Sequence, residues 1–265
     1  MHTILYKEEH STVSPNGPKY SPTSAALPIT TLTLLAESYF SESLPPDRIL
    51  IEKFNHRITG RTLATLRDGK WLNDEVINFY MLLLQQRDDS ISITILHQRR
   101  PSRFFPSFLT KLLTKRLDKY DYRQVKRWTR SIDVFDFEKL YFPINVSNSH
   151  WTLAVVYMQT RRIQYCDSLL NTTTIYLTAL KRWIQDEHAD KKGIPLLNNY
   201  EWVVVPCSSE TTPKQTNGYD CGVFTIMSAD LIARNLDIML LSQNYMPTLR
   251  RRIVLDIVRG HLDSS

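Results

Sequence analysis

Three neighbouring segments with the composition of β-strands constrain the fold of this chain most. They are KLYFPIN (139–145), HWTLAVVYM (150–158) and RRIQYCDS (161–168), all rich in β-branched and aromatic residues. Only a short turn, around residues 159–161, separates the last two. Strands joined in this way pair as an antiparallel hairpin. The sequence therefore predicts a small antiparallel sheet built on this hairpin.

Segments with a helical pattern lie on both sides of these strands. In the clearest one, 71–86, Asn73 or Asp74 can cap the helix, and apolar residues recur with the spacing of a buried face at positions 76, 77, 80, 83 and 84. Further helices are expected at 29–40, 103–117, 122–130, 172–187, 221–235 and 247–260, and further strands at 49–59 and, short and buried, at 201–206. Helices, then a small sheet, then helices again predict an α+β domain.

The first 29 residues differ in composition from the rest. They include STVSPNGPKYSPTSAALP, which is rich in Ser, Thr and Pro and has no periodic apolar face. We therefore expect residues 1–29 to be a flexible segment and residues 30–265 to form one folded domain. The first ten residues, MHTILYKEEH, place two glutamates where a secretory signal would carry apolar residues. A reducing compartment is expected.

Composition also argues against several classes of protein. The three cysteines form no CxxC pair, so neither a disulfide framework nor a metal site is expected. No apolar run approaches the roughly 20 residues that span a membrane. The surplus of 33 Lys and Arg over 27 Asp and Glu is spread along the chain, and the run LRRRIV at 249–254 is interpreted as the solvated face of a helix. Direct nucleic-acid binding is therefore not expected.

Cys221 is the candidate for a reactive group. It lies in QTNGYDCGVF, between an aspartate and a glycine, and opens an apolar run with helical character. A free cysteine is usually a small buried hydrophobe, and only a positive, partly exposed setting makes a thiolate. A cysteine at a helix N-terminus meets the positive end of the helix dipole, which favours the thiolate. The chain must then also supply a base and a group that orients it.

His150 and Asp167 fit these two roles. His150 opens one strand of the predicted hairpin and Asp167 ends the other, so pairing of the strands brings both side chains to the same end of the sheet. A histidine that opens a strand and an aspartate that ends one are by themselves more often structural. Together with Cys221 they supply the nucleophile, base and orienting acid of a thiol hydrolase.

The loop before Cys221 adds a candidate for transition-state stabilisation. The amide of Gln215 can share an oxyanion hole with the backbone N–H of Cys221. Gly218 and Gly222 would allow this loop to approach a substrate backbone closely.

The same segments resemble the SUMO-specific cysteine proteases, also called sentrin-specific or ubiquitin-like-protein-specific proteases. The resemblance extends from about residue 54 to the C-terminus and is carried by WLNDEVINFYMLLL, VKRWT, HWTLAVVY, YCDS and QTNGYDCGVF. It implies a papain-like α+β fold, with a small mixed or antiparallel sheet packed between helices. By position it implies His150 as general base, Asp167 as its orienter and Cys221 as nucleophile, with Gln215 as oxyanion donor.

The resemblance also implies a substrate-binding role for two tryptophans and an aspartate. In proteases of this type the C-terminal di-glycine of the modifier threads a narrow tunnel roofed by indoles, and the matching positions are Trp71 and Trp151. Flat aromatic walls close on glycine but exclude any side chain. Trp71 could instead pack the start of its helix. Asp74 matches a position that contacts the modifier, but it could instead be an N-cap.

The resemblance implies a monomeric cysteine endopeptidase and isopeptidase without a cofactor. It would cleave after the C-terminal Gly-Gly of a SUMO-like modifier, both maturing the precursor and releasing the modifier from lysines of target proteins, in the nucleus, the cytoplasm or both. Three alternatives stay open: a protease for another ubiquitin-like modifier, an acetyltransferase with the same Cys-His-Asp site, and a non-catalytic module that binds a modifier.

Overall fold

The computed structural model describes residues 29–41, 43–94, 99–107, 109, 120–173, 175–196 and 202–263. The first helix, α1, spans Ile29–Ser38. The proposed boundary after residue 29 stays a prediction, because residues 1–28 lie outside the described part of the chain. None of the helices in that part is both long enough and apolar enough to cross a membrane.

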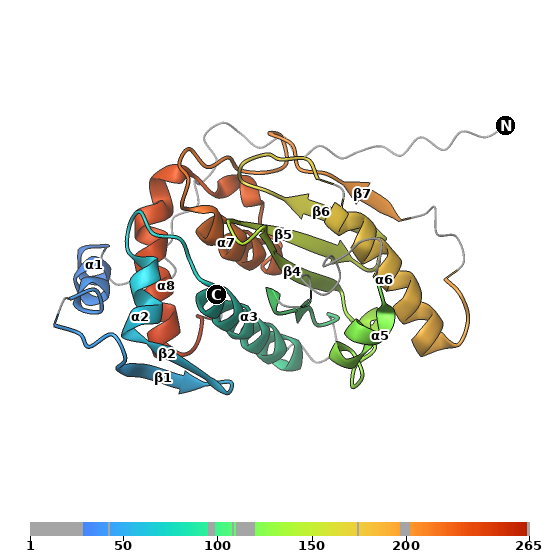
Figure 1. Ribbon diagram of the computed structural model, residues 1–265, viewed down its shortest axis with the longest axis horizontal. Coiled ribbons are helices and arrows are strands. Elements are labelled where there is room, and N and C mark those ends of the chain that lie inside the picture. The colour runs from blue at the N-terminus through green and yellow to red at the C-terminus, as the bar shows by residue number, and fades with distance from the viewer. Residues whose placement is uncertain are drawn as a thin grey trace.

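A five-stranded sheet forms the centre of the molecule (Figure 1). Its strands, in spatial order, are β3 (Arg103–Phe104), β4 (Lys139–Val146), β5 (His150–Tyr157), β6 (Arg162–Cys166) and β7 (Val203–Val205). The three central strands are antiparallel, as the sequence predicts, whereas each edge strand pairs in parallel with its neighbour. The sheet is therefore mixed, with the predicted hairpin at its middle.

Helices cover both faces of the sheet. On one face lie α3 (Asp74–Thr94), α7 (Cys221–Ala233) and α8 (Met246–Arg259), and on the other lies α6 (Ile175–Lys192) (Figure 1). Successive residues of β4 enter opposite cores, since Tyr141 packs with the first group while Leu140 and Phe142 pack with the second. Because both faces are covered, the central strands are buried almost throughout.

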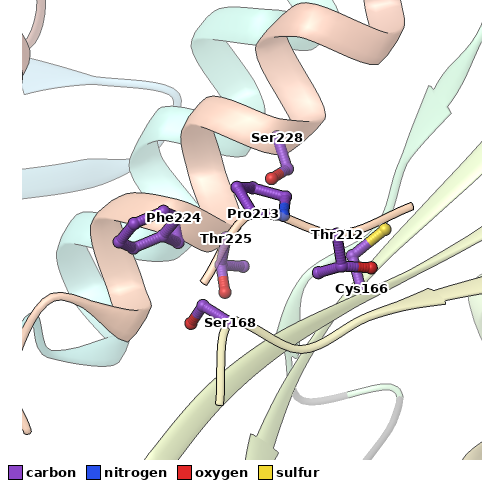
Figure 2. Close-up of a pocket in the computed structure, with 7 residues that line it drawn as sticks. All are labelled: Cys166, Ser168, Thr212, Pro213, Phe224, Thr225 and Ser228. Atoms are coloured by element: carbon purple, nitrogen blue, oxygen red, sulfur yellow. The ribbon is translucent and has the colours of Figure 1, made fainter. Parts of the chain in front are cut away.

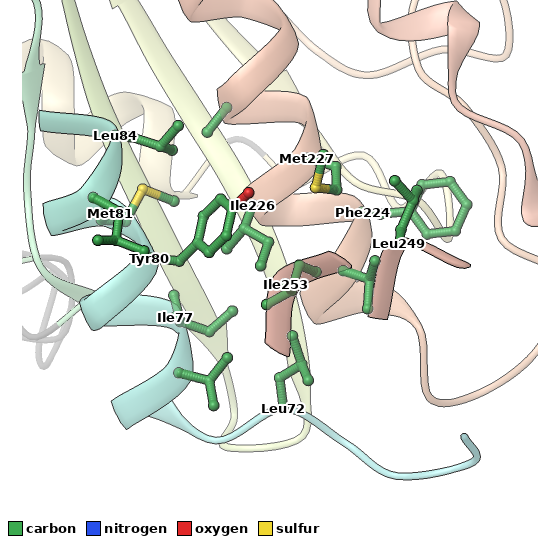
Figure 3. Close-up of a cluster of buried hydrophobic side chains, with 14 of the residues drawn as sticks. Leu72, Ile77, Tyr80, Met81, Leu84, Phe224, Ile226, Met227, Leu249 and Ile253 are labelled. Carbon is green, nitrogen blue, oxygen red and sulfur yellow. The ribbon is translucent and has the colours of Figure 1, made fainter. Parts of the chain in front are cut away.

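The larger core lies between α3, α7 and α8 (Figure 3). The five apolar positions predicted to form the buried face of α3 are all buried, and they contact α7 and α8 residues such as Ile226 and Ile253. α7 is buried over its whole length, which explains why its apolar residues show no one-sided pattern. In this core, α3 and α8 both pack against α7, the helix that begins at Cys221.

Several predicted elements differ from the structure. Residues 49–59 form two strands, β1 (Ile49–Lys53) and β2 (His56–Thr59), because Phe54 and Asn55 take left-handed backbone angles and turn the chain back. Residues 103–104 form strand β3 instead of opening a helix, and most of the remaining predicted helix lies outside the described residues. β7 is an edge strand, and its first residue, Val203, is exposed where a buried strand was expected.

The remaining short elements connect these layers. They are α2 (Gly60–Leu63) and α5 (Tyr122–Val125), with 3₁₀ turns at Ala64–Leu66, Lys126–Trp128, Val134–Asp136, Ile238–Leu240 and Gln243–Tyr245. The predicted helix at 122–130 is therefore one α turn continued by a 3₁₀ turn.

Candidate active site

Two strands and a helix, β5, β6 and α7, bring their ends together at one end of the central strands of the sheet. In the β5–β6 pairing Leu153 lies opposite Cys166, so His150, three residues before Leu153, and Asp167, one residue after Cys166, reach the same end. α7 begins at Cys221 and packs against β5. The hairpin predicted from the sequence therefore places His150 and Asp167 side by side.

The carboxylate of Asp167 lies close to the His150 ring and is held there by further hydrogen bonds. Nε2 of His150 lies 2.6 Å from Oδ1 of Asp167. The same carboxylate accepts hydrogen bonds from the backbone N–H of Leu169, at 2.8 Å, and from the side-chain amide of Asn171, at 3.2 Å. Because Asp167 is only 1% exposed, these donors hold it in one orientation. Asn171 was not identified from the sequence.

The other ring nitrogen of His150, Nδ1, is available to Cys221. Since Nε2 is engaged by Asp167, Nδ1 is the nitrogen available for the hydrogen bond to the Cys221 thiol. Burial by itself lowers the pKa of His150, but the hydrogen bonds to Asp167 and Cys221 and their negative charges outweigh it and raise the pKa to about 9. The imidazole of His150 is therefore protonated at neutral pH beside Cys221.

All three cysteines are buried, including Cys221 at 2% exposure where a partly exposed setting was expected, so the two others differ from it in their neighbours and not in burial. Burial raises the pKa of Cys166 to about 12 and also raises the pKa of Cys207. Cys166 lines a small cavity of about 10 Å³ next to α7, together with Ser168, Thr212 and Ser228. Figure 2 shows these side chains around it. Both thiols are therefore held in the neutral form, unlike a cysteine that shares a hydrogen bond with a charged histidine.

Gln215 is held at the site by the residue that follows Asp167. Its backbone N–H donates to the Ser168 carbonyl at 2.9 Å, and its side-chain oxygen accepts from the Ser168 hydroxyl at 2.5 Å. The amide nitrogen donates to the Asn217 carbonyl at 2.5 Å. An amide group carries two N–H bonds, so these contacts leave one unused, and its role as an oxyanion donor stays a prediction. Ser168, which the sequence analysis did not single out, thus sets the orientation of Gln215.

A cavity of about 220 Å³ opens onto Cys221 and His150. The two predicted tryptophans line it, together with Leu72, Asn73, Asp74, Asn145, Asn148 and Ser149. Trp71 is 51% exposed and its indole N–H donates to the Gly218 carbonyl at 2.8 Å, whereas Trp151 is buried and donates to the Leu72 carbonyl at 2.8 Å. Because Trp71 is half exposed, it does not pack in the core and instead forms part of the cavity wall near the opening.

Asp74 lies at the rim of this cavity. Asn73 caps α3, because its side-chain oxygen accepts from the backbone N–H of Val76 at 3.0 Å. Of the two N-cap candidates predicted from the sequence, it is therefore Asn73 that caps α3. Asp74 is the exposed first residue of the helix, and its contact with a modifier stays a prediction.

The two glycines of the loop differ from each other in their surroundings. A Cβ at Gly222 would lie 2.9 Å from Leu72, so this glycine allows α7 to pack against the segment that precedes α3. The sequence analysis assigned it to a close approach of substrate, and the structure assigns it to Leu72. Gly218 faces open space, so its approach to a substrate stays a prediction.

Comparisons with known proteins agree on one family. Residues 70–260 match the sequence profile of the Ulp1 protease family, C-terminal catalytic domain. Sentrin-specific protease 2 of Rattus norvegicus is 35% identical over 218 residues, which are 82% of this chain and 35% of the relative. Ubiquitin-like-specific protease 1A of Arabidopsis thaliana is 35% identical over 215 residues, which are 77% of this chain and 40% of the relative. The chain thus spans well under half the length of these relatives.

Two solved structures resemble this one closely in fold. The Ulp1-like SUMO protease catalytic domain of Chaetomium thermophilum has a TM-score of 0.72 at 23% identity and covers 88% of this chain and 90% of its own. The C-terminal Ulp1 protease domain in complex with Smt3, the yeast orthologue of SUMO, has a TM-score of 0.70 at 24% identity and covers 88% and 96%. At such identities the likeness concerns the fold alone, and it confirms the predicted papain-like α+β fold.

Proposed function

Because this chain belongs to the Ulp1 protease family, we propose that it is a cysteine protease that cleaves after the C-terminal Gly-Gly of a SUMO-like modifier. It would mature the modifier precursor and release the modifier from lysines of target proteins. The observation that carries the proposal is the contact of His150 with both Asp167 and Cys221 at the base of a tryptophan-lined cavity. The names of the sentrin-specific relatives support the substrate class.

The first chemical step forms a thioester. The Cys221 thiolate attacks the carbonyl carbon of the terminal glycine, and the resulting oxyanion is stabilised by the free N–H of Gln215 and the backbone N–H of Cys221. The imidazolium of His150 then gives its proton to the leaving amine, and the C–N bond breaks. Asp167 keeps the ring oriented throughout and stabilises its positive charge.

The second step releases the modifier. Neutral His150 takes a proton from a water molecule, which attacks the thioester carbonyl, and the C–S bond breaks to leave the glycine carboxylate. The departing sulfur leaves as a thiolate beside the newly protonated imidazole, which restores the starting pair, and the product acid loses its remaining proton to solvent. The reaction requires no group besides the side chains already described.

Selection for a Gly-Gly tail would come from the cavity walls. A di-glycine backbone would lie flat between Trp71 and Trp151, which both line the cavity, and the indoles would exclude a substrate side chain. Asp74 at the rim would contact the folded body of the modifier, which would supply much of the binding energy. We further propose that the protein acts as a monomer, and that it works in the nucleus, the cytoplasm or both.

The tail of the substrate tests this function. When the final glycine of a folded SUMO-like precursor is replaced by alanine, we expect kcat/KM to fall about 10²-fold, because the methyl group displaces the scissile carbonyl from Cys221 by about 1 Å. Trp151→Ala should impair kcat and KM together and reduce this preference for glycine. An isolated peptide ending in Gly-Gly should be a poor substrate. The measurement is kcat/KM for the three substrates.

The same assay, extended to a ubiquitin precursor and to acetyl-CoA with an acceptor protein, also tests the alternative activities. Equal rates for the precursor, its alanine variant and the peptide would contradict the selective cavity. Preference for a ubiquitin precursor would assign the site to another modifier. Turnover of acetyl-CoA with an acceptor protein, in place of the precursor, would identify an acetyltransferase.

The raised pKa of His150 predicts the alkaline limit of activity. The active form requires a protonated imidazole, so kcat/KM should be maintained at neutral pH and fall as the pH rises through about 9, where this proton is lost. Since the hydrogen bond to Asp167 raises this pKa, the residual activity of Asp167→Asn should fall at lower pH than that of the parent. The check is kcat/KM measured against pH. A value that keeps rising well above pH 9 would contradict the requirement for a protonated His150.

A further inference from the structure

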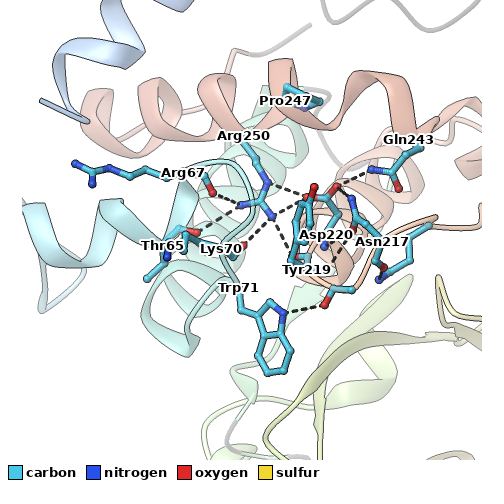
Figure 4. A network of polar contacts seen from close by, with 12 residues as sticks. Thr65, Arg67, Lys70, Trp71, Asn217, Tyr219, Asp220, Gln243, Pro247 and Arg250 are labelled. Carbon is cyan, nitrogen blue, oxygen red and sulfur yellow. Dashed lines mark hydrogen bonds and ion pairs between the residues drawn. The ribbon is translucent and has the colours of Figure 1, made fainter.

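Arg250, on α8, is one of the largest fully buried side chains in the described part of the protein, with 1% of its surface exposed. It lies in the run LRRRIV, which the sequence analysis interpreted as a solvated helix face. That interpretation is wrong for Arg250, whose side chain points away from solvent toward the loop before Cys221 (Figure 4). A guanidinium is buried only where partners compensate its charge and its donors.

The partners of Arg250 come from two segments that are far apart in the sequence. From the loop before Cys221, Nε donates to Oδ1 of Asp220 at 2.8 Å and Nη2 donates to the Tyr219 carbonyl at 2.9 Å. From the segment before α3, Nη2 donates to the Lys70 carbonyl at 2.9 Å, and Nη1 donates to the Arg67 carbonyl at 3.2 Å. A planar fork of donors can hold two backbone segments at a fixed separation in this way.

Each of the two segments continues directly into a wall of the active site. Lys70 precedes Trp71, and Asp220 precedes Cys221. On the outer side the segments meet again, where the Trp71 indole donates to the Gly218 carbonyl. Arg250 therefore holds the two walls together from the interior while Trp71 closes them at the surface.

Arg250 also balances a buried charge next to the nucleophile. Asp220 is buried, and its second oxygen accepts hydrogen bonds from Asn217, at 2.7 Å, and Gln243, at 2.6 Å. Both of these donors are neutral, so among the contacts of Asp220 with the described residues it is Arg250 that carries the compensating charge. An uncompensated carboxylate beside Cys221 would disfavour its thiolate.

We propose that Arg250 is a positioning residue of the active site, which sets the spacing of the two cavity walls and neutralises Asp220 beside the thiolate. The first role rests on the proposed function, because it concerns the fit of a Gly-Gly tail. The second concerns only the reactivity of Cys221. The two roles therefore require different measurements.

The spacing role is tested by Arg250→Lys. Lysine keeps the positive charge near Asp220, but a single ammonium group cannot reproduce the planar fork that reaches both segments. We expect kcat/KM for the folded precursor to fall about 10²-fold and the preference for a terminal glycine over alanine to shrink, because the walls lose their spacing. Circular dichroism should show that the variant is folded at the assay temperature.

The matched control is Arg251→Lys, one residue further along α8. Arg251 is less buried and pairs with Glu37 and, in the segment before α3, with Asp68, but within the described part of the chain it makes no hydrogen bond to the loop before Cys221, so it does not link the two walls. It should keep both parental activity and parental glycine preference. A folded Arg250→Lys variant with parental values would overturn the spacing role, whereas a parent enzyme inactive on every precursor would overturn the proposed function instead.

The charge role is tested without any modifier, by alkylation of Cys221 with iodoacetamide as a function of pH. Arg250→Gln leaves the Asp220 carboxylate without its compensating charge, so the thiolate should form less readily and the alkylation profile should shift to higher pH, whereas Arg250→Lys keeps the charge and should stay near the parental profile. Mass spectrometry of the Cys221 peptide gives the rate at that residue alone. A folded Arg250→Gln variant with a profile at the parental pH, or shifted to lower pH, would overturn this role.

Discussion

Cys221→Ser is expected to abolish turnover of the modifier precursor while leaving its binding largely intact. A serine hydroxyl is not held as an anion by an imidazolium, so the attacking group is lost, whereas the cavity walls are unchanged. The loss should reach the detection limit, as expected for removal of a nucleophile. The measurements are single-turnover cleavage of the folded precursor and, with the same protein, binding of the mature modifier.

Cys166→Ser and Cys207→Ser are the matched controls. Both thiols are buried, and burial raises the pKa of each, so neither supplies a thiolate at neutral pH. Both variants should retain cleavage if they remain folded, which circular dichroism checks. Retained hydrolysis in Cys221→Ser, or its loss in a folded Cys166→Ser or Cys207→Ser variant only, would contradict the assignment of the nucleophile.

Asp167→Asn should keep the fold and lower kcat by about 10⁴-fold. The amide can occupy the same space, but it neither stabilises the imidazolium nor enforces the orientation in which Nδ1 faces Cys221. The substrate-binding walls are not altered, so KM should change much less than kcat. Steady-state kinetics on the folded precursor separate the two parameters.

Asp47→Asn provides the control for removal of a carboxylate. Asp47 is exposed and pairs with Arg61 on the surface, where such pairs contribute little. Its kcat should equal that of the parent. A kcat of Asp167→Asn within a few-fold of the parent would contradict the role of Asp167 as orienter of His150.

The sequence was sufficient to predict the parts of the site that depend on local pattern. The alternation of β5 and β6 and the short turn between them determine that His150 and Asp167 reach the same end of the hairpin. The start of α7 at Cys221 follows from the apolar run that it opens. These features involve neighbours in sequence or a single hairpin, so residue pattern alone specifies them.

The parts that could not be predicted depend on contacts between distant segments. Nothing in the run LRRRIV distinguishes Arg250 from the less buried Arg251 and Arg252 until α8 is packed against the loop before Cys221. Ser168 becomes relevant only when the Gln215 loop folds back onto the end of β6. Likewise, Gly222 is required by Leu72, whose position depends on the packing of two helices. Such long-range packing is outside the reach of periodicity and spacing.

The most direct test of the proposed function is covalent capture by a modifier. A folded SUMO-like modifier that carries a C-terminal electrophile in place of its last glycine is mixed with the protein, alongside ubiquitin with the same electrophile. We expect an adduct with the SUMO-like probe alone, located at Cys221 by peptide mass spectrometry and absent from Cys221→Ser. No adduct, an adduct at Cys166 or Cys207, or equal capture of ubiquitin would contradict a SUMO-directed protease that acts through Cys221.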